Sequence, residues 1–247
     1  MEDLFYEIFE NLPRQGPGDR ESTRKALHMV KELPEDPEIL DIGCGVGKQT
    51  IDLACLTGGR ITAVDNHEPF LEKLTLNAAK SKCLAEVRAA KGDMAALDLP
   101  PGSFDLIWSE GAAYSMGFEN ALLAWRSLLR PKGSIAVSEL VWFRKDPPDE
   151  AKNFFLIEYP AMKHFKEHFP TFEALGYELT GYFPLPDESW WTDYYRPMEK
   201  KLAELRLKYQ GNSKAQKLFD TFDKEQEMYR KYSAWYGYGF YIMRRTH

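Results

Sequence analysis

The sequence predicts an α/β fold in which a doubly wound, mainly parallel sheet carries helices on both faces. Between residues 38 and 140, short apolar runs alternate with segments of helical periodicity. The first apolar run ends in the glycine turn Gly43-Cys44-Gly45-Val46-Gly47, and the second ends in Asp65. Strands separated by helices pair in parallel, and the helices then cover both faces of the sheet. A chain of 247 residues suits one such domain with an elaboration.

The expected elements follow one another in a regular order. Strands are expected at 39–42, 60–65, 85–90, 104–108 and 134–141, with helices at 49–56, 69–81 and 120–129 between them. The tripeptide Pro131-Lys132-Gly133 is expected to form the turn before the fifth strand. Two further strands are expected late in the chain, at 177–183 and 239–244.

The segments on either side of this core are expected to be helical. Leu4, Phe5, Ile8, Phe9 and Leu12 form one apolar stripe, and a second helix should begin near Asp19, with Asp19 or Ser22 as its cap, and end before Pro34. We therefore divide the chain into an N-terminal helical lid at 1–34 and a main domain at 35–247. The aromatic-rich stretch at about 142–236 is expected to be a C-terminal helical insertion in that domain.

Composition and charge exclude several classes of protein. A hydrophobic share of 44% with 28% charged residues excludes disordered and collagen-like chains. No apolar run approaches the roughly 18 residues needed to cross a bilayer, so no membrane span is expected. The net charge of -6 disfavours nucleic acid and anionic membranes as partners. The acidic N-terminus lacks the features of a signal peptide, and three cysteines without a C-x-x-C pair indicate neither a disulfide framework nor a zinc site; we expect a cytoplasmic protein.

The glycine turn is the main candidate for a ligand site. Ligands of doubly wound sheets bind at the carboxyl ends of the strands, where glycines allow close approach and a helix N-terminus offers free N–H groups. Asp65 is placed to accept the hydroxyls of a ribose, and Asp93, after the third strand, could accept from an adenine amino group. Asp41 would repel a pyrophosphate and attract an ammonium group, directly or through water. A nicotinamide dinucleotide needs a small residue where Lys48 stands.

Five ordered motifs resemble those of class I S-adenosylmethionine-dependent methyltransferases. They are Ile39-Leu40-Asp41-Ile42-Gly43-Cys44-Gly45-Val46-Gly47, Val64-Asp65, Gly92-Asp93-Met94, Phe104-Asp105-Leu106-Ile107-Trp108-Ser109 and Leu128-Leu129-Arg130-Pro131-Lys132-Gly133. The resemblance implies a Rossmann-like, seven-stranded mixed sheet whose last strand, near 239–243, is antiparallel.

The same resemblance implies S-adenosylmethionine as cofactor, S-adenosylhomocysteine as product, and roles by position. Arg14-Gln15-Gly16-Pro17-Gly18 resembles the segment that closes over the cofactor in enzymes that act on small molecules. The implied cofactor-binding residues are Gln15, Gly16, Asp41, Gly43, Gly45, Asp65, Asn66, Asp93, Met94 and Ser109.

Catalytic residues are harder to assign from the sequence. Methyl transfer from a sulfonium is an in-line displacement, so alignment and exclusion of water supply much of the acceleration. Glu110 and Tyr114 leave the fourth strand at the edge of the site and could deprotonate or orient the acceptor. Glu110 could equally bind the cofactor, and Tyr114 could simply pack. Cys44 is interpreted as a small residue that fits the turn, not as a nucleophile.

Two other segments allow more than one interpretation. His164-Phe165-Lys166-Glu167-His168 matches a zinc-peptidase pattern but lacks a further ligand, so we expect a solvated helix end and no metal. The stretch from Tyr182 to Tyr195, with Trp190 and Trp191, could wall an acceptor pocket or form a core or homodimer contact.

The sequence therefore predicts transfer of a methyl group from S-adenosylmethionine to a small-molecule acceptor. Two alternatives stay open: a NAD-dependent oxidoreductase on a similar sheet, and a non-catalytic protein that binds S-adenosylmethionine as a signal. A deep pocket beside Tyr114 and Trp190 would favour the enzyme over the sensor.

Overall fold

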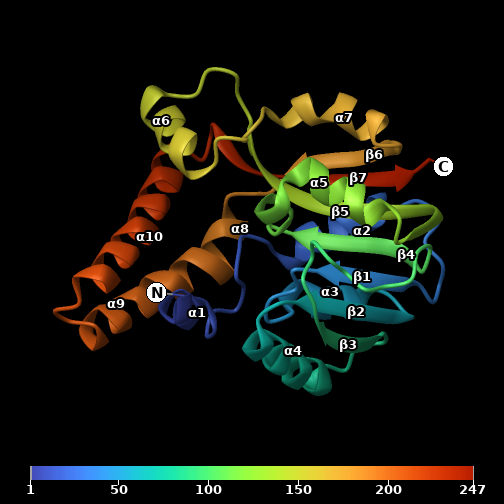
Figure 1. The fold of residues 1–247 in the computed structure, drawn as a ribbon, viewed down its shortest axis with the longest axis horizontal. Coiled ribbons are helices and arrows are strands. Elements are labelled where there is room, and N and C mark those ends of the chain that lie inside the picture. Colours follow the sequence, from blue (N-terminus) through green and yellow to red (C-terminus); the bar gives the residue numbers. More distant parts are fainter. Residues whose placement is uncertain (1, 247) are drawn as a thin grey trace.

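A computed structural model, which describes residues 2–246, contains one seven-stranded sheet (Figure 1). Its strand order is β3-β2-β1-β4-β5-β7-β6. The strands are β1 (Glu38–Ile42), β2 (Arg60–Asp65), β3 (Glu86–Lys91), β4 (Phe104–Glu110), β5 (Leu129–Trp142), β6 (Tyr177–Pro184) and β7 (Tyr236–Arg245).

The strand pairing confirms the mixed sheet and its antiparallel last strand. β1 pairs in parallel with β2 and β4, and the parallel pairing continues to β3 on one side and β5 on the other. β7 inserts between β5 and β6 and runs antiparallel to both. The carboxyl ends of β1, β2 and β4 therefore lie at the same edge of the sheet as the beginning of β7.

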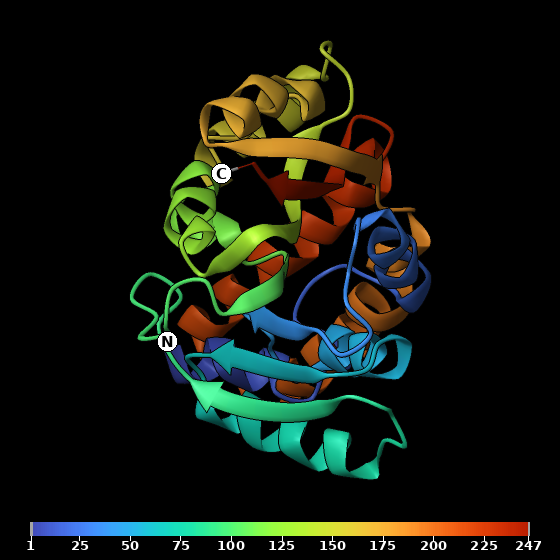
Figure 2. The same cartoon turned by 90° about the vertical axis from the view of Figure 1, so that its right-hand side faces the viewer.

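Helices cover both faces of the sheet, as the alternation of strands and helices predicts (Figures 1 and 2). Side chains alternate along the central strands: Ile39 and Leu106 join one buried cluster, whereas Leu40 and Ile107 join another. The first cluster includes residues of α2 (Arg20–Met29) and α3 (Lys48–Leu56), and the second those of α5 (Phe118–Arg126) and α7 (Phe169–Ala174). α4 (Glu68–Lys80) packs on β2 and β3.

A group of helices lies beyond the carboxyl edge of the central strands (Figure 1). It comprises the N-terminal helix α1 (Glu2–Phe9) and helices from the predicted insertion: α6 (Asp149–Glu158), α8 (Glu188–Trp190), the π-helical turn η3 (Trp191–Tyr195), α9 (Arg196–Lys208) and α10 (Ser213–Tyr232). α1 packs against α9, and α9 packs against α10, so segments from the two ends of the chain form one layer. None of the helices described is long and apolar enough to cross a membrane.

Several local expectations are confirmed and several need adjustment. Asp19 caps α2, its side chain accepting from the Ser22 N–H at 2.7 Å. α5 ends at Arg126, three residues earlier than expected, because β5 begins at Leu129. The expected turn at residues 131–133 lies within that strand, where its pairing with β4 is irregular.

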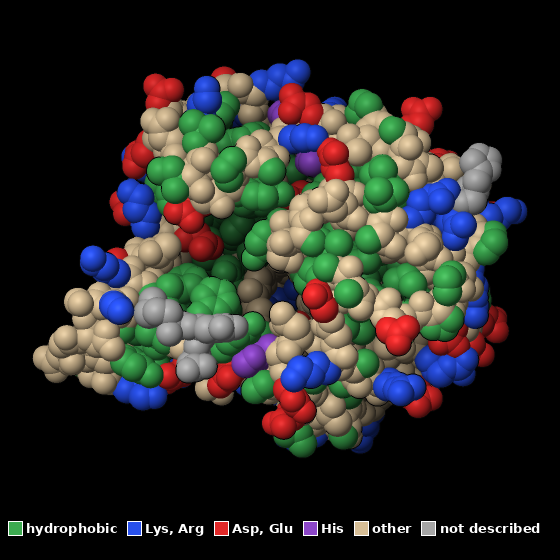
Figure 3. All heavy atoms as spheres, in the orientation of Figure 1, with side chains coloured by type: hydrophobic (Ala, Val, Ile, Leu, Met, Phe, Trp, Pro, Cys, Tyr) green, Lys and Arg blue, Asp and Glu red, His purple; other side chains and the backbone are tan. Residues whose placement is uncertain are grey.

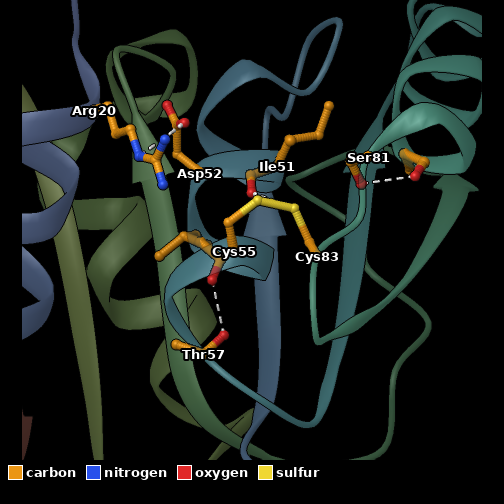
Figure 4. The surroundings of a disulfide bond; sticks show 9 residues. Arg20, Ile51, Asp52, Cys55, Thr57, Ser81 and Cys83 are labelled. Atoms are coloured by element: carbon orange, nitrogen blue, oxygen red, sulfur yellow. Dashed lines mark hydrogen bonds and ion pairs between the residues drawn. A yellow bond between two sulfur atoms is a disulfide. The ribbon is translucent and has the colours of Figure 1, made fainter.

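The expectation that the cysteines form no disulfide is wrong. Cys55 of α3 and Cys83, in the connection between α4 and β3, are paired, with their Cα atoms 4.3 Å apart (Figure 4). Their separation of 28 residues carries no sequence signal of pairing. The packing of α3 beside the end of α4 brings them together, and Cys44 is the remaining free cysteine.

Candidate active site

A cavity of about 610 Å³ lies between the carboxyl edge of the sheet and the added helices. Figure 3 shows the molecule hollowed between these two parts, with hydrophobic side chains lining the hollow. The lining at the sheet includes the glycine turn, Asp65, Asn66, Met94 and the segment from Glu110 to Ser115. The opposite wall comes from α1, α6, α8, η3, α10 and the start of β7. The cavity therefore has one end at the glycine turn and another among aromatic residues.

Close packing explains the glycines of the turn. Gly43 and Gly45 both have positive φ, at 72° and 54°, which side chains rarely adopt. A Cβ atom at Gly43 would lie 2.5 Å from the Ala112 Cβ, and one at Gly45 would lie 2.3 Å from the Gln15 Oε1. Any larger residue would collide with the wall of the cavity. The turn thus brings bare backbone to the cavity, as the sequence predicts.

Asp65 is held by the turn that it faces. Its Oδ2 accepts from the Gly45 N–H at 2.9 Å, and its Oδ1 accepts from the His67 N–H at 3.0 Å. Each carboxylate oxygen keeps a further lone pair, and Asp65 lines the cavity with Asn66. A rigid acceptor therefore stands where a ribose is expected.

Cys44 lies inside the turn and is 1% exposed. Burial, with the nearby carboxylates of Asp41 and Asp65, raises the pKa of its thiol well above the ordinary value. The thiolate needed for nucleophilic attack is therefore disfavoured. Cys44 is a small residue that fits the turn, in agreement with the interpretation from the sequence.

Gln15 and Gly16 belong to the segment that covers the turn. The Gln15 Oε1 accepts from the Val46 N–H at 2.8 Å, and its Nε2 donates to the Phe9 carbonyl at 3.0 Å. Gly16 lines the cavity with open space around its Cα. The Gly18 N–H donates to the Ser189 carbonyl at 3.0 Å, which ties the segment to α8. The N-terminal segment therefore closes the cavity over the glycine turn.

A buried ion pair joins this segment to the sheet. The Arg14 Nη1 donates to the Glu110 Oε2 at 2.8 Å, and the two side chains are 3% and 4% exposed. The Glu110 Oε1 also accepts from the Trp108 Nε1 at 2.8 Å and from the Thr23 hydroxyl at 3.2 Å. Three donors thus surround the carboxylate that the sequence put forward as a base. This geometry is that of an anchor for residues 14–23.

Arg14 retains capacity for another partner. Burial opposes its positive charge, but the carboxylate of Glu110 outweighs that effect, and the pKa of Arg14 is raised. Its Nε and Nη2 are buried and have no hydrogen-bond partner among residues 2–246. Arg14 lines the same cavity as Gly43 and Gly45, and an anionic group of a ligand is a partner that these N–H groups fit.

Three of the predicted cofactor residues do not line the cavity. Asp41 is fully buried in β1, where Thr50 donates to its Oδ2 at 2.5 Å. Its carboxyl group therefore does not reach the cavity to contact an ammonium group directly. The Ser109 hydroxyl is buried and donates to the Ile42 carbonyl at 2.9 Å. Asp93 is exposed and accepts from the Ala95 N–H at 2.9 Å, the turn-forming role of such an aspartate, whereas the neighbouring Met94 lines the cavity.

Burial changes the charge expected of Asp41. Desolvation raises its pKa to about 7, and its Oδ1 has no hydrogen-bond partner among the described residues. A contact through water with a ligand's ammonium group stays a prediction.

The far end of the cavity is aromatic and acidic. Tyr114, in the 3-10 turn η1 (Ala113–Met116), lies between the glycine turn and this end. The other walls include Trp190, stacked on Tyr229 with ring centroids 4.0 Å apart, and four further tyrosines. Trp190 is 4% exposed, so the aromatic stretch folds within its own chain and lines a pocket. The tyrosines are Tyr194 and Tyr195 of η3 and Tyr236 and Tyr238 of β7.

Two glutamates that sequence reasoning missed face this end. Glu225 of α10 accepts from the Tyr195 hydroxyl at 2.9 Å, and Glu158 ends α6. Burial raises the pKa of Glu225 to about 7. The only signal for Glu225 was its position on the apolar face of its helix, one and two turns after Phe222 and Leu218, which also line the cavity. Arg14 begins the motif at residues 14–18, but the sequence assigns it no role in binding.

The predicted absence of a metal site stays a prediction. Among the described residues, no cluster of three or more His, Cys, Asp or Glu side chains could hold a metal ion. His164 caps the 3-10 turn η2 (Phe165–His168). His168 is not solvated as expected: it is 3% exposed beside Phe118, and burial lowers its pKa to about 4.

Comparison with known proteins agrees with this geometry. Residues 39–133 match the family model described as a methyltransferase domain. The chain is 27% identical over 118 residues to a sterol 24-C-methyltransferase of Neurospora crassa, which covers 47% of this chain and 31% of that protein. It is 25% identical over 168 residues to the Saccharomyces cerevisiae sterol 24-C-methyltransferase, covering 65% and 44%. The chain thus spans less than half the length of these curated relatives.

Solved structures share the whole fold. The chain superposes on a methyltransferase from Geobacter sulfurreducens, crystallised with S-adenosylhomocysteine, with a TM-score of 0.83 and 18% identity over 98% of each chain. A methyltransferase from Thiobacillus denitrificans gives a TM-score of 0.78 and 18% identity, covering 97% of this chain and 96% of that one. Over residues 39–133 the chain is therefore similar to a methyltransferase domain, and its seven-stranded sheet has the fold of these solved methyltransferases.

Proposed function

We propose that this protein transfers a methyl group from S-adenosylmethionine to a small-molecule acceptor. One observation carries the proposal: a single cavity joins the glycine turn and Asp65 to a pocket walled by Tyr114 and Trp190. A cofactor at the first end and an acceptor at the second would meet within it. The cavity volume of about 610 Å³ lies in the range of ligand sites.

The residues at the first end fit the chemical groups of the cofactor. Asp65 has lone pairs for ribose hydroxyls, and Asn66 and Met94 lie beside it for the base. The unpartnered Nε and Nη2 of Arg14 fit the carboxylate of the methionine part. Gly43 and Gly45 line the same end of the cavity with bare backbone. When bound, S-adenosylmethionine supplies an electrophilic methyl group on a sulfonium.

The chain's own residues contribute alignment and exclusion of water. Gln15 and the Arg14–Glu110 pair hold residues 14–18 across the cavity, which limits access of water to the reacting atoms. Tyr114 lies between the two ends and is placed to orient the acceptor. Tyr114 is 49% exposed, yet desolvation and the charges of Glu225 and Glu139 raise its pKa, so we assign it the role of a hydrogen-bonding phenol and not of a base. We assign Glu110 to anchoring the lid.

Binding and transfer can be tested in one series. Calorimetry with S-adenosylhomocysteine should give about micromolar affinity, and NAD should give no heat. Arg14→Gln should weaken the S-adenosylhomocysteine affinity at least about tenfold, because it removes a charged donor to the carboxylate. Arg24→Gln, an exposed change on α2, is the matched control.

The outcomes separate the three candidate functions. Binding of NAD alone would overturn the proposal in favour of hydride transfer. Binding of S-adenosylhomocysteine without methyl transfer to any of a panel of amines, phenols, carboxylic acids and alkenes would favour the non-catalytic sensor. The extension of the cavity beyond the glycine turn supports the enzyme, since a sensor needs no second pocket.

Location and partners follow from charge, composition and packing. The cytoplasmic location and the lack of nucleic-acid partners rest on charge and composition, and both stay predictions. The paired Cys55 and Cys83 count against a strongly reducing compartment. A homodimer also stays a prediction, although Trp190 no longer calls for one.

A further inference from the structure

The charges around the acceptor end of the cavity restrict what it can bind. Among residues 2–246, the lining contains one basic side chain, Arg14, and it is paired with Glu110 at the cofactor end. The acceptor end instead holds the carboxyl groups of Glu225 and Glu158, for which no ion pair is found in the described part of the chain. An acceptor bearing a phosphate or carboxylate would find no counter-charge there.

The two glutamates act on the same space from different helices. Glu158 ends α6 and Glu225 lies midway along α10, and the charge of Glu158 is felt at Glu225. The Tyr195 hydroxyl occupies one lone pair of Glu225 and leaves the others open to the cavity. The two carboxyl groups therefore present hydrogen-bond acceptors, and no positive charge, to an incoming substrate.

The tyrosines of the cavity lie near the same carboxylates that an acceptor would meet. Burial is the main cause that raises the pKa of Tyr194, Tyr195, Tyr236 and Tyr238, and the charge of Glu225 adds to it in each case. A bound phenol or thiol would resist deprotonation in the same way, because its anion would face the same carboxylates. The field instead favours a group that carries positive charge or develops it during reaction.

The aromatic walls favour the same kind of group. Ring faces carry negative electrostatic potential and attract cations within about 6 Å of their centroids. The walls formed by Trp190 and the tyrosines otherwise offer apolar surface, to which a hydrocarbon body would bind. An acceptor that is positively charged at one atom and apolar elsewhere therefore matches the pocket.

We propose that the methyl acceptor is an amine carried on an apolar body, bound at its nitrogen by Glu225 and Glu158 and enclosed by the aromatic walls. This inference rests on the proposed function and names its substrate class. The bound ammonium first gives a proton to Glu225, from which it passes to water. The neutral nitrogen then uses its lone pair to form the new N–CH₃ bond as the methyl carbon's bond to sulfur breaks, and that bonding pair stays on sulfur. The product leaves as a methylated ammonium.

Three probes of one skeleton test the charge preference. With the protein saturated with S-adenosylhomocysteine, we would titrate 2-phenylethylamine, 2-phenylethanol and phenylacetate at about pH 8 by calorimetry. The amine should bind at least about tenfold more tightly than the alcohol, and phenylacetate should not bind. Equal or tighter binding of the alcohol or the acid would overturn the inference.

Two variants on the same helix locate the preference. Glu225→Gln should reduce the ratio of amine to alcohol affinity at least about threefold, because Glu158 and the aromatic walls remain, whereas Glu227→Gln, an exposed change two residues away, should keep it. Survival of the full preference in Glu225→Gln would overturn the assignment. If Glu225→Gln does not fold, the wild-type comparison still decides. A wild-type protein that fails to bind S-adenosylhomocysteine would contradict the proposed function before any amine is added.

Discussion

Replacing Glu110 by glutamine tests whether this residue anchors the lid or acts as a base. Glutamine has nearly the same shape, and its oxygen can still accept from the Trp108 Nε1 and the Thr23 hydroxyl. Its NH₂ group would then face the Arg14 Nη1, which now lies 2.8 Å from a carboxylate oxygen. The change replaces an ion pair by two opposed donors and leaves Arg14 buried without its counter-charge.

The expected cost follows from the burial of the pair. Loss of one partner of a buried ion pair costs about 3–5 kcal/mol, because the remaining charge is uncompensated. Because the glutamine oxygen keeps two hydrogen bonds, we expect the free energy of unfolding to fall by about 3 kcal/mol, near the lower end of this range. With a urea m-value of about 3 kcal/mol/M, the midpoint should fall by about 1 M.

Urea unfolding followed by circular dichroism measures this loss. The control is Glu21→Gln, which removes an exposed pair with Arg24 whose side chains are 49% and 72% exposed. It should cost less than about 0.5 kcal/mol. The reasoning would be refuted if Glu110→Gln kept full stability and S-adenosylhomocysteine affinity while turnover fell by about 100-fold or more, which is the behaviour of a lost base.

Three further perturbations have defined outcomes. Asp65→Ala should weaken S-adenosylhomocysteine binding by about 1–3 kcal/mol in calorimetry, because a charged acceptor for the ribose is lost; unchanged affinity would remove Asp65 from the site. Burial raises the pKa of Glu139 from 4.5 to about 8, so the native state holds a proton that the unfolded state releases, and stability should fall as pH rises from about 4.5 to about 8. In urea unfolding, the free energy of unfolding of the wild type should fall by up to about 5 kcal/mol across that range, and Glu139→Gln should abolish this fall. An unchanged pH dependence in the variant would contradict the assignment. Reduction with dithiothreitol should lower the free energy of unfolding by about 3.5 kcal/mol by opening the loop closed by Cys55 and Cys83, and Cys83→Ser should not respond; a wild-type protein that also does not respond would show that the two thiols are not paired.

The sequence alone determined the sheet and the cofactor end of the cavity. The strands β1 to β4 and the helices between them follow from apolar runs and helical periodicity, which are local signals. The glycine turn and Asp65 lie 20 residues apart within one strand–helix–strand unit, so the fold of that unit brings them into contact. Asp19 likewise caps its helix through its own neighbours.

Only the tertiary structure decided which carboxylates face the cavity. Asp41 and Asp65 both lie near the carboxyl ends of their strands, yet Asp41 is fully buried against Thr50 whereas Asp65 lines the cavity. Sequence spacing does not reveal this difference, because it depends on the layer packed over each strand. Glu110 presents the same problem, since its partner Arg14 is 96 residues away.

The acceptor end belongs to the tertiary structure entirely. Tyr114, Trp190, Glu225 and Tyr238 come from four separate segments and meet because β7 inserts antiparallel at β5 while α10 crosses the carboxyl edge of the sheet. The disulfide between Cys55 and Cys83 has the same origin. Local patterns encode which segments become helix or strand, but the burial and charge of a side chain depend on neighbours that only the packed chain supplies.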